Sequence, residues 1–476
     1  LIDNSGNNLN GTLNNFTLTG ANSNFLANGP IAPGTTCSPV TMVPYYADAD
    51  SDGYGNAGAV TYFAAGCTGL TGFVLDSTDC NDNDPLIYPG HGCAVNRTLT
   101  VHEAGINGWY TNITDAFNAA ISGGAGVNAK AVLTSRLDAN DPPDSFQAHA
   151  GMELDGYVKT GKLEDLTFLY KEQGWDTIFP ADLIKTLTVD GKIYSVPVNI
   201  HRANVLWWNP DSAKKAGITS APTTIAEFKD DLKKFKAAGM DGIALAGNGD
   251  WAIAHLFDVI LLADLGTAKY VGLFNGKTKW DGPEVKQAAT DLSEILSYGN
   301  SSKTLDWPDA GNLVVKDKTA GFFVMGDWAS SQWESQGYKP GVDYAWAAAP
   351  GTTKNYMWLS DSFTLPKGAP DRDAAIAWLT LCGSLAGQDA FNPKKGSIAV
   401  RKDSNAKLYD AYLQSAMKDW KTLDTQAGSI VHGVMGNNAF MAAYDSAVGK
   451  FYQAGAKDVA GFQKDLAAAY ATGQAA

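Results

Sequence analysis

The sequence carries no excess of basic charge. Its 36 Lys and Arg residues are outnumbered by 50 Asp and Glu residues, which gives a formal net charge of −14. A chain this acidic is a poor partner for nucleic acid or for an anionic membrane surface. The sequence also shows no apolar run long enough to predict a helix that spans a bilayer. We expect neither nucleic acid nor a lipid surface as a partner.

Sequence motifs of catalysis are missing as well. No Gly-x-Ser-x-Gly elbow, His-Glu-x-x-His helix or Walker loop occurs. A pair of carboxylates for glycoside hydrolysis could hide among the 50 acidic residues, but no spacing marks such a pair. We therefore expect a binding protein and not an enzyme. Turnover of an aryl glycoside would contradict this expectation.

Cysteine is scarce, and four of the 5 cysteines lie in the first hundred positions: Cys37, Cys67, Cys80 and Cys93. This part of the chain is poor in apolar residues, so we expect disulfides and an oxidising compartment. Their pairing stays open. Zinc is the weaker alternative because no Cys-x-x-Cys spacing occurs. Cys382 falls in an apolar helix and is expected to be a buried thiol.

The length of 476 residues predicts two to three domains, and 45% hydrophobic with 18% charged residues is typical of a globular protein. The chain starts at Leu1 without a Met, so any signal peptide is expected to have been removed. From residue 119 onward strand and helix patterns alternate. This alternation predicts an α/β fold with mainly parallel sheets.

One stretch, residues 194–209, predicts an unusually long strand. Turn signals bracket it, Asp190-Gly191 before and Asn209-Pro210 after. Polar residues, among them Asn199, His201 and Arg202, interrupt its apolar pattern. A strand too long for one lobe can run into the next and lie on the floor of the cleft between them, where ligands bind. The alternative is a buried strand with satisfied polar groups.

A metal site is predicted in residues 45–90. Asp48, Asp50 and Asp52 stand on alternate positions before Gly53, which suits a calcium ion with several oxygen ligands. A second acidic group follows, with Asp79, Asp82 and Asp84 as the further candidate ligands. Ala59 stands where an EF-hand needs its Glu. The segment resembles the metal-binding repeat of bacterial surface proteins and thrombospondin type 3 repeats. A solvated acidic loop is the alternative.

The part from about residue 119 to the end resembles the solute-binding proteins of sugar ABC transporters, in the branch that binds glucose or mannose. Seven motifs in order carry the resemblance: Ile121-Ser122-Gly123-Gly124-Ala125-Gly126-Val127-Asn128, Pro142 to Gly151, Val196 to Asn209, Gly326-Asp327-Trp328-Ala329, Ser360-Asp361-Ser362-Phe363, Asn392 to Ser397, and Val431-His432-Gly433. The resemblance implies a two-lobe periplasmic-binding-protein fold, with crossing segments near 200–204, 358–363 and 396–401.

The implied domain organisation has four parts. Residues 1–40 form an Asn- and Gly-rich strand fragment or linker, and residues 41–97 form the small, loop-rich, calcium-binding extension. One lobe takes residues 98–201 and 362–398, and the other takes 202–360 and 400–476. The segment before Ile121 lacks the Trp-Trp pair typical of the family, so the first strand–helix unit looks replaced. A lobe without that strand would expose unpaired sheet edges.

A sugar site needs flat aromatic rings and planar polar groups that make paired hydrogen bonds. The candidate stacking residues are Trp251, Trp307 and Trp328. The resemblance implies polar contacts from Gln147, His149, Asp361, Lys395 and His432, with Asp361 accepting from two hydroxyl groups. As alternatives, Trp251 and Trp328 could be core residues, His432 a satisfied buried histidine, and Asp361 with Lys395 a structural ion pair. His201, Trp207 and Trp208 are expected to be structural.

Two functions follow from these patterns. The first is a monomeric, periplasmic or extracellular protein that captures a monosaccharide such as glucose and delivers it to the permease of an ABC transporter. The second is a secreted calcium-binding surface or adhesion protein whose sugar-binding part is vestigial. The cleft motifs favour the first function, and the acidic segment with the altered first unit favours the second.

Overall fold

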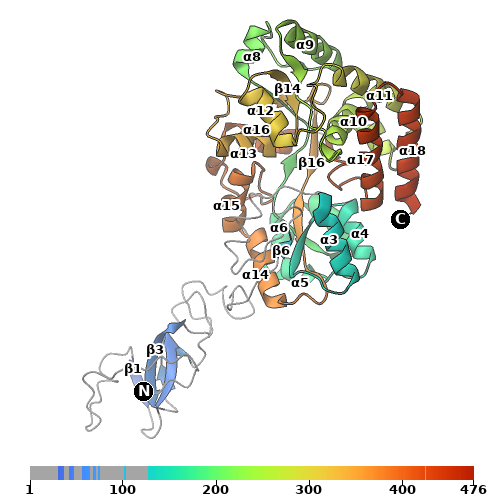
Figure 1. The fold of residues 1–476 in the computed structure, drawn as a ribbon. Coiled ribbons are helices and arrows are strands. Elements are labelled where there is room, and N and C mark those ends of the chain that lie inside the picture. Colours follow the sequence, from blue (N-terminus) through green and yellow to red (C-terminus); the bar gives the residue numbers. More distant parts are fainter. Residues whose placement is uncertain are drawn as a thin grey trace. The chain divides into compact units, whose positions relative to one another are not determined.

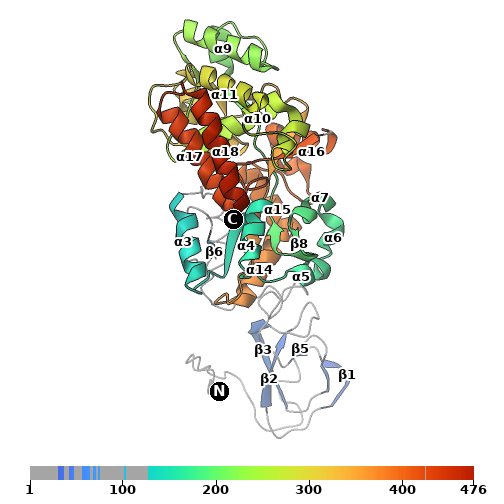
Figure 2. The same ribbon diagram turned by 90° about the vertical axis from the view of Figure 1, so that its right-hand side faces the viewer.

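The structure, a computed structural model, describes residues 127–423 and 425–475, and six short strands before them. The predicted calcium ligands and the first four cysteines lie outside the described residues. The chain divides into two compact units, one made chiefly of Leu1–Arg97 and one of Thr98–Ala375 with Leu379–Ala476. Figures 1 and 2 show both units.

The first unit contains two small antiparallel sheets. One pairs β1 (Ile31–Thr36) with β4 (Thr68–Leu70). In the other, β2 (Met42–Ala47) lies between β3 (Asn56–Ala64) and β5 (Phe73–Val74). The segment that the sequence predicts as loop-rich therefore also forms strands.

The second unit begins with a lobe, here called lobe 1, built on a sheet of order β10-β17-β7-β6. Its strands are β6 (Val101–His102), β7 (Ser145–His149), β10 (Ser195–Pro197) and β17 (Asp361–Thr364). Its helices are α3 (Val127–Asp138), α4 (Met152–Lys159), α5 (Thr167–Glu172), α6 (Trp175–Ile178), α7 (Ala181–Thr186), α14 (Arg372–Gly383) and α15 (Leu385–Lys395), and β8 (Thr188–Val189) and β9 (Lys192–Ile193) form a hairpin. β6 pairs in parallel with β7, so the sheet has a strand from the segment whose sequence departs from the family.

The other lobe, lobe 2, is built on a sheet of order β13-β14-β12-β15. Its strands are β12 (Val205–Trp208), β13 (Asp241–Ile243), β14 (Ala320–Val324) and β15 (Ala345–Ala348). Its helices are α8 (Pro210–Lys215), α9 (Ile225–Ala237), α10 (Trp251–Gly272), α11 (Pro283–Leu296), α12 (Trp307–Val315), α13 (Trp328–Ser335), α16 (Ala411–Thr422), α17 (Asn438–Gln453) and α18 (Val459–Ala475), with a 3-10 turn η1 (Ala406–Leu408) before α16. Most of them gather in the upper part of Figure 1. A capping box of Thr224 and Glu227 starts α9.

Helix α10 corrects one expectation. By length and composition it is apolar enough to cross a membrane, although the sequence was expected to hold no such run. In the structure 67% of its most apolar window is buried inside the protein. The helix also buries His255 and Asp258, and it is kinked at Gly266. These features identify α10 as a core helix of lobe 2.

The long strand predicted at residues 194–209 is wrong in form: the chain divides there into three short strands. β10 belongs to lobe 1, β12 belongs to lobe 2, and β11 (His201–Arg202) lies between them. β11 pairs with β16 (Asn355–Leu359), which also pairs with β18 (Thr425–Gly428). Ile200 bridges to Ile398 of the third predicted crossing segment. The stretch does run from one lobe to the other.

Two asparagines separate these strands. Asn199 Oδ1 accepts a hydrogen bond from the backbone N–H of Asp361 at 2.8 Å, and Asn204 Oδ1 accepts from that of Met357 at 2.9 Å. A side-chain amide thus takes the place of a ladder carbonyl on each side of β11. Nearby, α15 supplies Gln388, whose Nε2 donates to the Pro197 carbonyl, and Asn392, whose Nδ2 donates to that of Val198. The backbone between the lobes therefore stays hydrogen-bonded without one continuous strand.

The prediction of mainly parallel sheets is also wrong for the described sheets. In the second unit the parallel pairs are β6 with β7, β13 with β14, and β16 with β18. β17 is antiparallel to both of its neighbours, and so is β12. β17 enters lobe 1 from the region between the lobes, whereas β7 and β10 run toward that region. A chain that crosses between two lobes therefore inserts antiparallel strands into each sheet.

Candidate functional site

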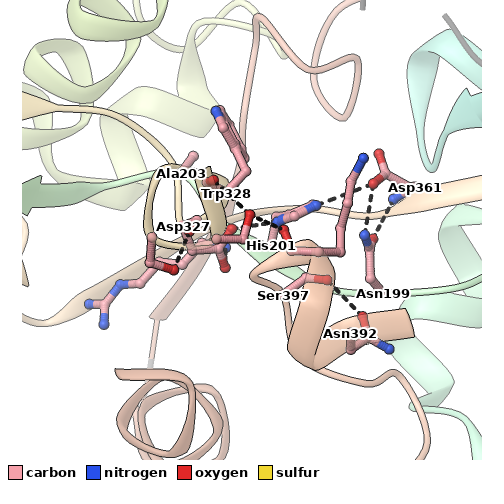
Figure 3. Close-up of polar contacts among 12 residues, drawn as sticks. Asn199, His201, Ala203, Asp327, Trp328, Asp361, Asn392 and Ser397 are labelled. Carbon is pink, nitrogen blue, oxygen red and sulfur yellow. Dashed lines mark hydrogen bonds and ion pairs between the residues drawn. The ribbon is translucent and has the colours of Figure 1, made fainter. Parts of the chain in front are cut away.

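Asp361, at the start of β17, is the centre of the polar contacts between the lobes (Figure 3). Its side chain is buried, and Oδ1 accepts a hydrogen bond from Gln147 Nε2 at 2.7 Å. Oδ2 accepts from Asn199 Nδ2 at 2.7 Å and lies 3.2 Å from His201 Nε2. Burial opposes the charged form, but His201, Lys395 and His149 hold the pKa of Asp361 well below its usual value. Asp361 is therefore a carboxylate at neutral pH.

His201 lies between two carboxylates. Its Nδ1 contacts Asp327 Oδ1, and Asp327 Oδ2 accepts from the backbone N–H of Arg202 at 2.8 Å. Burial lowers the pKa of His201, but Asp327 and Asp361 outweigh burial and raise it to about 9. His201 is thus an imidazolium that fixes the position of Asp361. The sequence pattern indicated a structural residue here, but it did not reveal these two partners.

His149, the last residue of β7, faces a second carboxylate pair. Its Nδ1 lies 2.6 Å from Glu153 Oε2 of α4, and its Nε2 lies 3.5 Å from Asp361 Oδ1. Glu153 is buried, and His149 is a hydrogen-bond partner of its side chain inside lobe 1. A chain of alternating carboxylates and imidazoles results, which runs Glu153, His149, Asp361, His201 and Asp327.

An aromatic cluster lies beside this charged chain. The ring of Trp328 at the start of α13 is 5.3 Å from the ring of His201, 5.7 Å from that of His255 and 5.1 Å from that of His432, measured between ring centroids. Trp251 contacts His432 at 5.9 Å. Both tryptophans are half-buried. Trp307 begins α12, and no ring contact among the described residues joins it to this cluster.

His255 and His432 form a pair of histidines on the lobe 2 side of the site. His255 is buried on α10, and its Nδ1 lies 3.0 Å from His432 Nε2. Burial lowers the pKa of His255 to about 4, despite the hydrogen bond to the Ala203 carbonyl, which raises it. Burial, reinforced by His255 and His149, also holds the pKa of His432 well below its usual value. Both rings are therefore neutral at neutral pH.

The predicted residues can now be placed. Gln147, His149 and Asp361 meet in lobe 1, and Trp251, Trp328 and His432 cluster in lobe 2. Lys395, half-buried at the end of α15, lowers the pKa of Asp361 by its charge, and its Nζ lies over the ring of Phe391 at 5.9 Å. Trp307 is the one predicted residue that the described contacts leave apart from the rest.

Four further residues belong to this arrangement and were not among the candidates: Asn199, His201, His255 and Asp327. Asn199 and His201 lie in the stretch that the sequence placed on the cleft floor, and Asp327 directly precedes Trp328. These neighbours were the available signal. His255 gave none, because it sits within an apolar helix.

A family model for bacterial extracellular solute-binding proteins matches residues 104–389. The chain belongs to this family. An uncharacterized ABC transporter extracellular-binding protein of Pyrococcus horikoshii is 35% identical over 74% of this chain and 78% of that protein. A protein of Rhizobium meliloti described as a probable sugar-binding periplasmic protein is 32% identical over 66% of this chain and 76% of its own length.

Two more distant likenesses complete the comparison. A glucose-binding protein of Saccharolobus solfataricus is 25% identical over 58% of this chain and 53% of that protein. The solved structure of a chitin oligosaccharide binding protein matches with a TM-score of 0.66 and 21% identity over 76% of this chain and 94% of that one. The latter confirms the predicted two-lobe fold. Because the family consists of binding proteins, the expectation of a protein that is not an enzyme is also confirmed.

In this solute-binding protein the lobes also touch beyond the crossing segments. The backbone N–H of Glu153, in the first turn of α4, donates to the Gly433 carbonyl at 2.9 Å, and that of Met152 donates to the Val434 carbonyl at 3.2 Å. Gly433 has a φ of +72°, and a Cβ there would lie 2.5 Å from Glu153 Oε2. Only a glycine fits this close approach. The loop that carries His432 thus contacts lobe 1 directly.

The arrangement suits a neutral, hydroxyl-rich ligand. The imidazolium of His201 offsets part of the negative charge, and Gln147, Asn199 and Asp361 provide planar donors and acceptors. A carboxylate offers about four acceptor positions, and three are taken by Gln147, Asn199 and His201. About one position on Asp361 remains for a ligand hydroxyl, fewer than the two that the resemblance implied. Among the described residues, no group of three or more His, Cys, Asp and Glu side chains could hold a metal ion.

Proposed function

We propose that this protein captures a monosaccharide, with glucose as the first candidate, between its two lobes and delivers it to the membrane permease of an ABC transporter. The observation that carries the proposal is the juxtaposition of the Asp361 cluster with the Trp328 cluster. One supplies charged and planar hydrogen-bonding groups, and the other supplies aromatic rings for the apolar face of a sugar. Relatives described as sugar-binding and glucose-binding support this assignment.

A single sugar ring fits the described contacts better than a long oligosaccharide. His149 of lobe 1 and His432 of lobe 2 face each other with their ring centroids 6.0 Å apart. The α4 backbone is hydrogen-bonded to the loop that bears His432. With the lobes this close, a chain of several sugar units would have to separate them. Such separation would break the hydrogen bonds of Met152 and Glu153.

The proposal is tested by isothermal titration of the purified protein with D-glucose, D-galactose, D-xylose and N,N′-diacetylchitobiose. We expect micromolar or tighter binding of one monosaccharide and no measurable binding of the disaccharide. Delivery is then tested by glucose uptake in cells that lack the protein and in cells that express it. Binding of the disaccharide alone, or no heat with any of the four sugars, would overturn the proposal.

We propose in addition that the acidic segment binds calcium in a structural role, through Asp48, Asp50, Asp52, Asp79, Asp82 and Asp84. The alternate spacing of the first three carboxylates before Gly53 supports this proposal. Titration of metal-free protein with calcium chloride is expected to give a saturable isotherm. In the triple substitution Asp48→Asn, Asp50→Asn and Asp52→Asn that isotherm should disappear, while glucose binding stays unchanged. If the triple variant gives the same calcium isotherm as the wild type, these carboxylates do not bind calcium and the segment is a solvated acidic loop.

A further inference from the structure

The hydrogen bonds behind His432 have a fixed direction. They start at the backbone carbonyl of Ala203, between β11 and β12, which can only accept a hydrogen bond. His255 Nε2 lies 3.0 Å from this oxygen. The proton of this hydrogen bond must therefore be on His255 Nε2.

The other nitrogen of His255 then has to be an acceptor. The residue is fully buried in α10, where an imidazolium would be strongly destabilised. A neutral imidazole carries one ring proton, and Nε2 already has it. The bare Nδ1 lies 3.0 Å from His432 Nε2. His432 must therefore donate through Nε2.

The tautomer of His432 determines what its other ring nitrogen, Nδ1, can do. A neutral His432 with its proton on Nε2 has a lone pair on Nδ1, and no described residue makes a hydrogen bond to that atom. His432 is partly exposed, with Trp328 and Trp251 of lobe 2 and His149 of lobe 1 around its ring. Nδ1 is thus an acceptor that the described residues leave unused.

We propose that His255 is a positioning residue that fixes the tautomer of His432, so that His432 Nδ1 accepts a hydrogen bond from a sugar hydroxyl. The inference rests on the proposed function for its ligand, but not for the tautomer itself. It explains a division of labour in the site. On the lobe 1 side, Gln147, Asn199 and His201 occupy most of Asp361, and lobe 2 supplies a neutral acceptor. One sugar hydroxyl can then donate to the remaining position on Asp361, and another can donate to His432 Nδ1.

Two variants of similar size separate the hydrogen bonds of His255. His255→Asn places a side-chain oxygen near the position of Nδ1, so it keeps the acceptor for His432 and loses the donor to Ala203. His255→Gln places a side-chain amide near the position of Nε2, so it keeps the donor and loses the acceptor. If His255 only fills space, the two variants behave alike. Thermal unfolding of both shows whether each one folds.

The tautomer is read without any sugar. Two-bond 1H–15N correlation spectra of protein labelled with 15N-histidine distinguish Nδ1–H from Nε2–H rings, and His432→Gln identifies the signal of His432. At pH 7.5 we expect the Nε2–H tautomer of His432 in the wild type and in His255→Asn. In His255→Gln the Nδ1–H tautomer should appear. An Nδ1–H ring in the wild type, or an unchanged Nε2–H ring in His255→Gln, would overturn the proposal.

Sugar binding provides the second readout. D-glucose affinity is expected to fall roughly tenfold in His255→Gln, the loss of about one hydrogen bond, and by less in His255→Asn. Equal losses in the two variants would refute the link between tautomer and ligand even if the spectra agree with it. If the wild type binds no sugar, the proposed function fails, and the spectra still decide the tautomer.

Discussion

Two histidines of the site, His201 and His255, are equally buried and have opposite charge states. Burial acts on His201 and on His255 in the same direction, toward the neutral ring. His201 has a carboxylate at each nitrogen and its pKa rises to about 9, whereas His255 has a carbonyl and another imidazole and its pKa falls to about 4. The partners decide the charge, and burial only sets how much the partners must overcome.

This difference gives the site a charged side, around Asp361, and a neutral side, around Trp328 and His432. In the proposed function the charged side supplies the stronger hydrogen bonds to hydroxyl groups, because these bonds are charge-assisted. The neutral side contributes apolar contact with little electrostatic bias. Four substitution experiments can break or sharpen this comparison.

The largest effect is expected from Asp361→Asn. The substitution keeps the shape of the side chain and removes the charge that Gln147, Asn199 and His201 all contact. Glucose affinity should fall roughly 100-fold or more, because a charged acceptor is lost and the pKa of His201 drops with it. Isothermal titration measures the loss. An affinity within threefold of the wild type would show that the charged side does not contact the ligand.

On the neutral side the corresponding change is Trp328→Ala, with Trp307→Ala as its control. Trp328 contacts the rings of His201, His255 and His432, so its removal takes away the aromatic surface between them. We expect an affinity loss of roughly 30-fold, equivalent to about 2 kcal/mol. Trp307→Ala should leave the affinity within about twofold, since no described ring contact joins it to the site. Similar losses in both variants would place Trp307 in the site after all.

The opposite charge states should appear in the pH dependence of stability. The pKa of His201 is raised, so its stabilisation is complete below about 6.5 and is lost as the pH rises to about 9. The pKa of His255 is lowered, so its stabilisation is complete above about 6.5 and is lost as the pH falls to about 4. Over its pH interval, each histidine changes the free energy of unfolding by roughly 3 kcal/mol.

Urea unfolding of the wild type, His201→Gln and His255→Gln isolates the contribution of each histidine to the pH dependence of stability. Between pH 6.5 and 9 the stability advantage of the wild type over His201→Gln should shrink, and between pH 6.5 and 4 its advantage over His255→Gln should shrink. Half-buried acids such as Asp264 and Glu334, whose pKa values are raised to about 7 and about 8, also make stability depend on pH, so the differences between variants carry the test. An advantage that does not change with pH would contradict the assigned charges.

The smallest effect is expected where the two sides meet, at the loop that bears His432. Gly433→Ala places a methyl group against Glu153 and should hold the lobes apart. Gly161→Ala is a matched control, because Gly161 has nearly the same φ, +73°, and open space around it. Both variants lose roughly 1 kcal/mol of stability to the positive φ. Only Gly433→Ala should also weaken glucose binding, by roughly five- to tenfold.

Much of the fold could be predicted from local sequence. The turn signals around residues 194–209 depend on neighbouring residues, and the structure has a turn at Asp190-Gly191 and a helix start at Asn209-Pro210. The division into β10, β11 and β12 could not be predicted in this way. The asparagines that separate these strands are bonded to Asp361 and Met357, more than 150 positions away.

The candidate site shows the same limit. Gln147, Asp361 and Trp328 were predicted from motifs and lie together. His201 gave no signal of its own, since the two carboxylates that determine its charge lie 126 and 160 positions further along the chain. Trp307 matched the expected residue type and neighbours, but no ring contact among the described residues joins it to the site. Local pattern identifies residue types suited to a site, whereas the return of a distant strand decides which of them meet.

The position of β17 in its sheet has a consequence for how the protein is made. Ser362 of this strand is bonded to Ala148 of β7, 214 positions earlier in the chain. During synthesis the sheet of lobe 1 is incomplete until more than three quarters of the polypeptide has been made. Until then, the edge of β7 that pairs with β17 has no partner strand. Contacts of such long range make folding slow, and unpaired edges invite association with other chains. The crossings that allow two lobes to clasp a small molecule thus also delay the moment at which either lobe is complete.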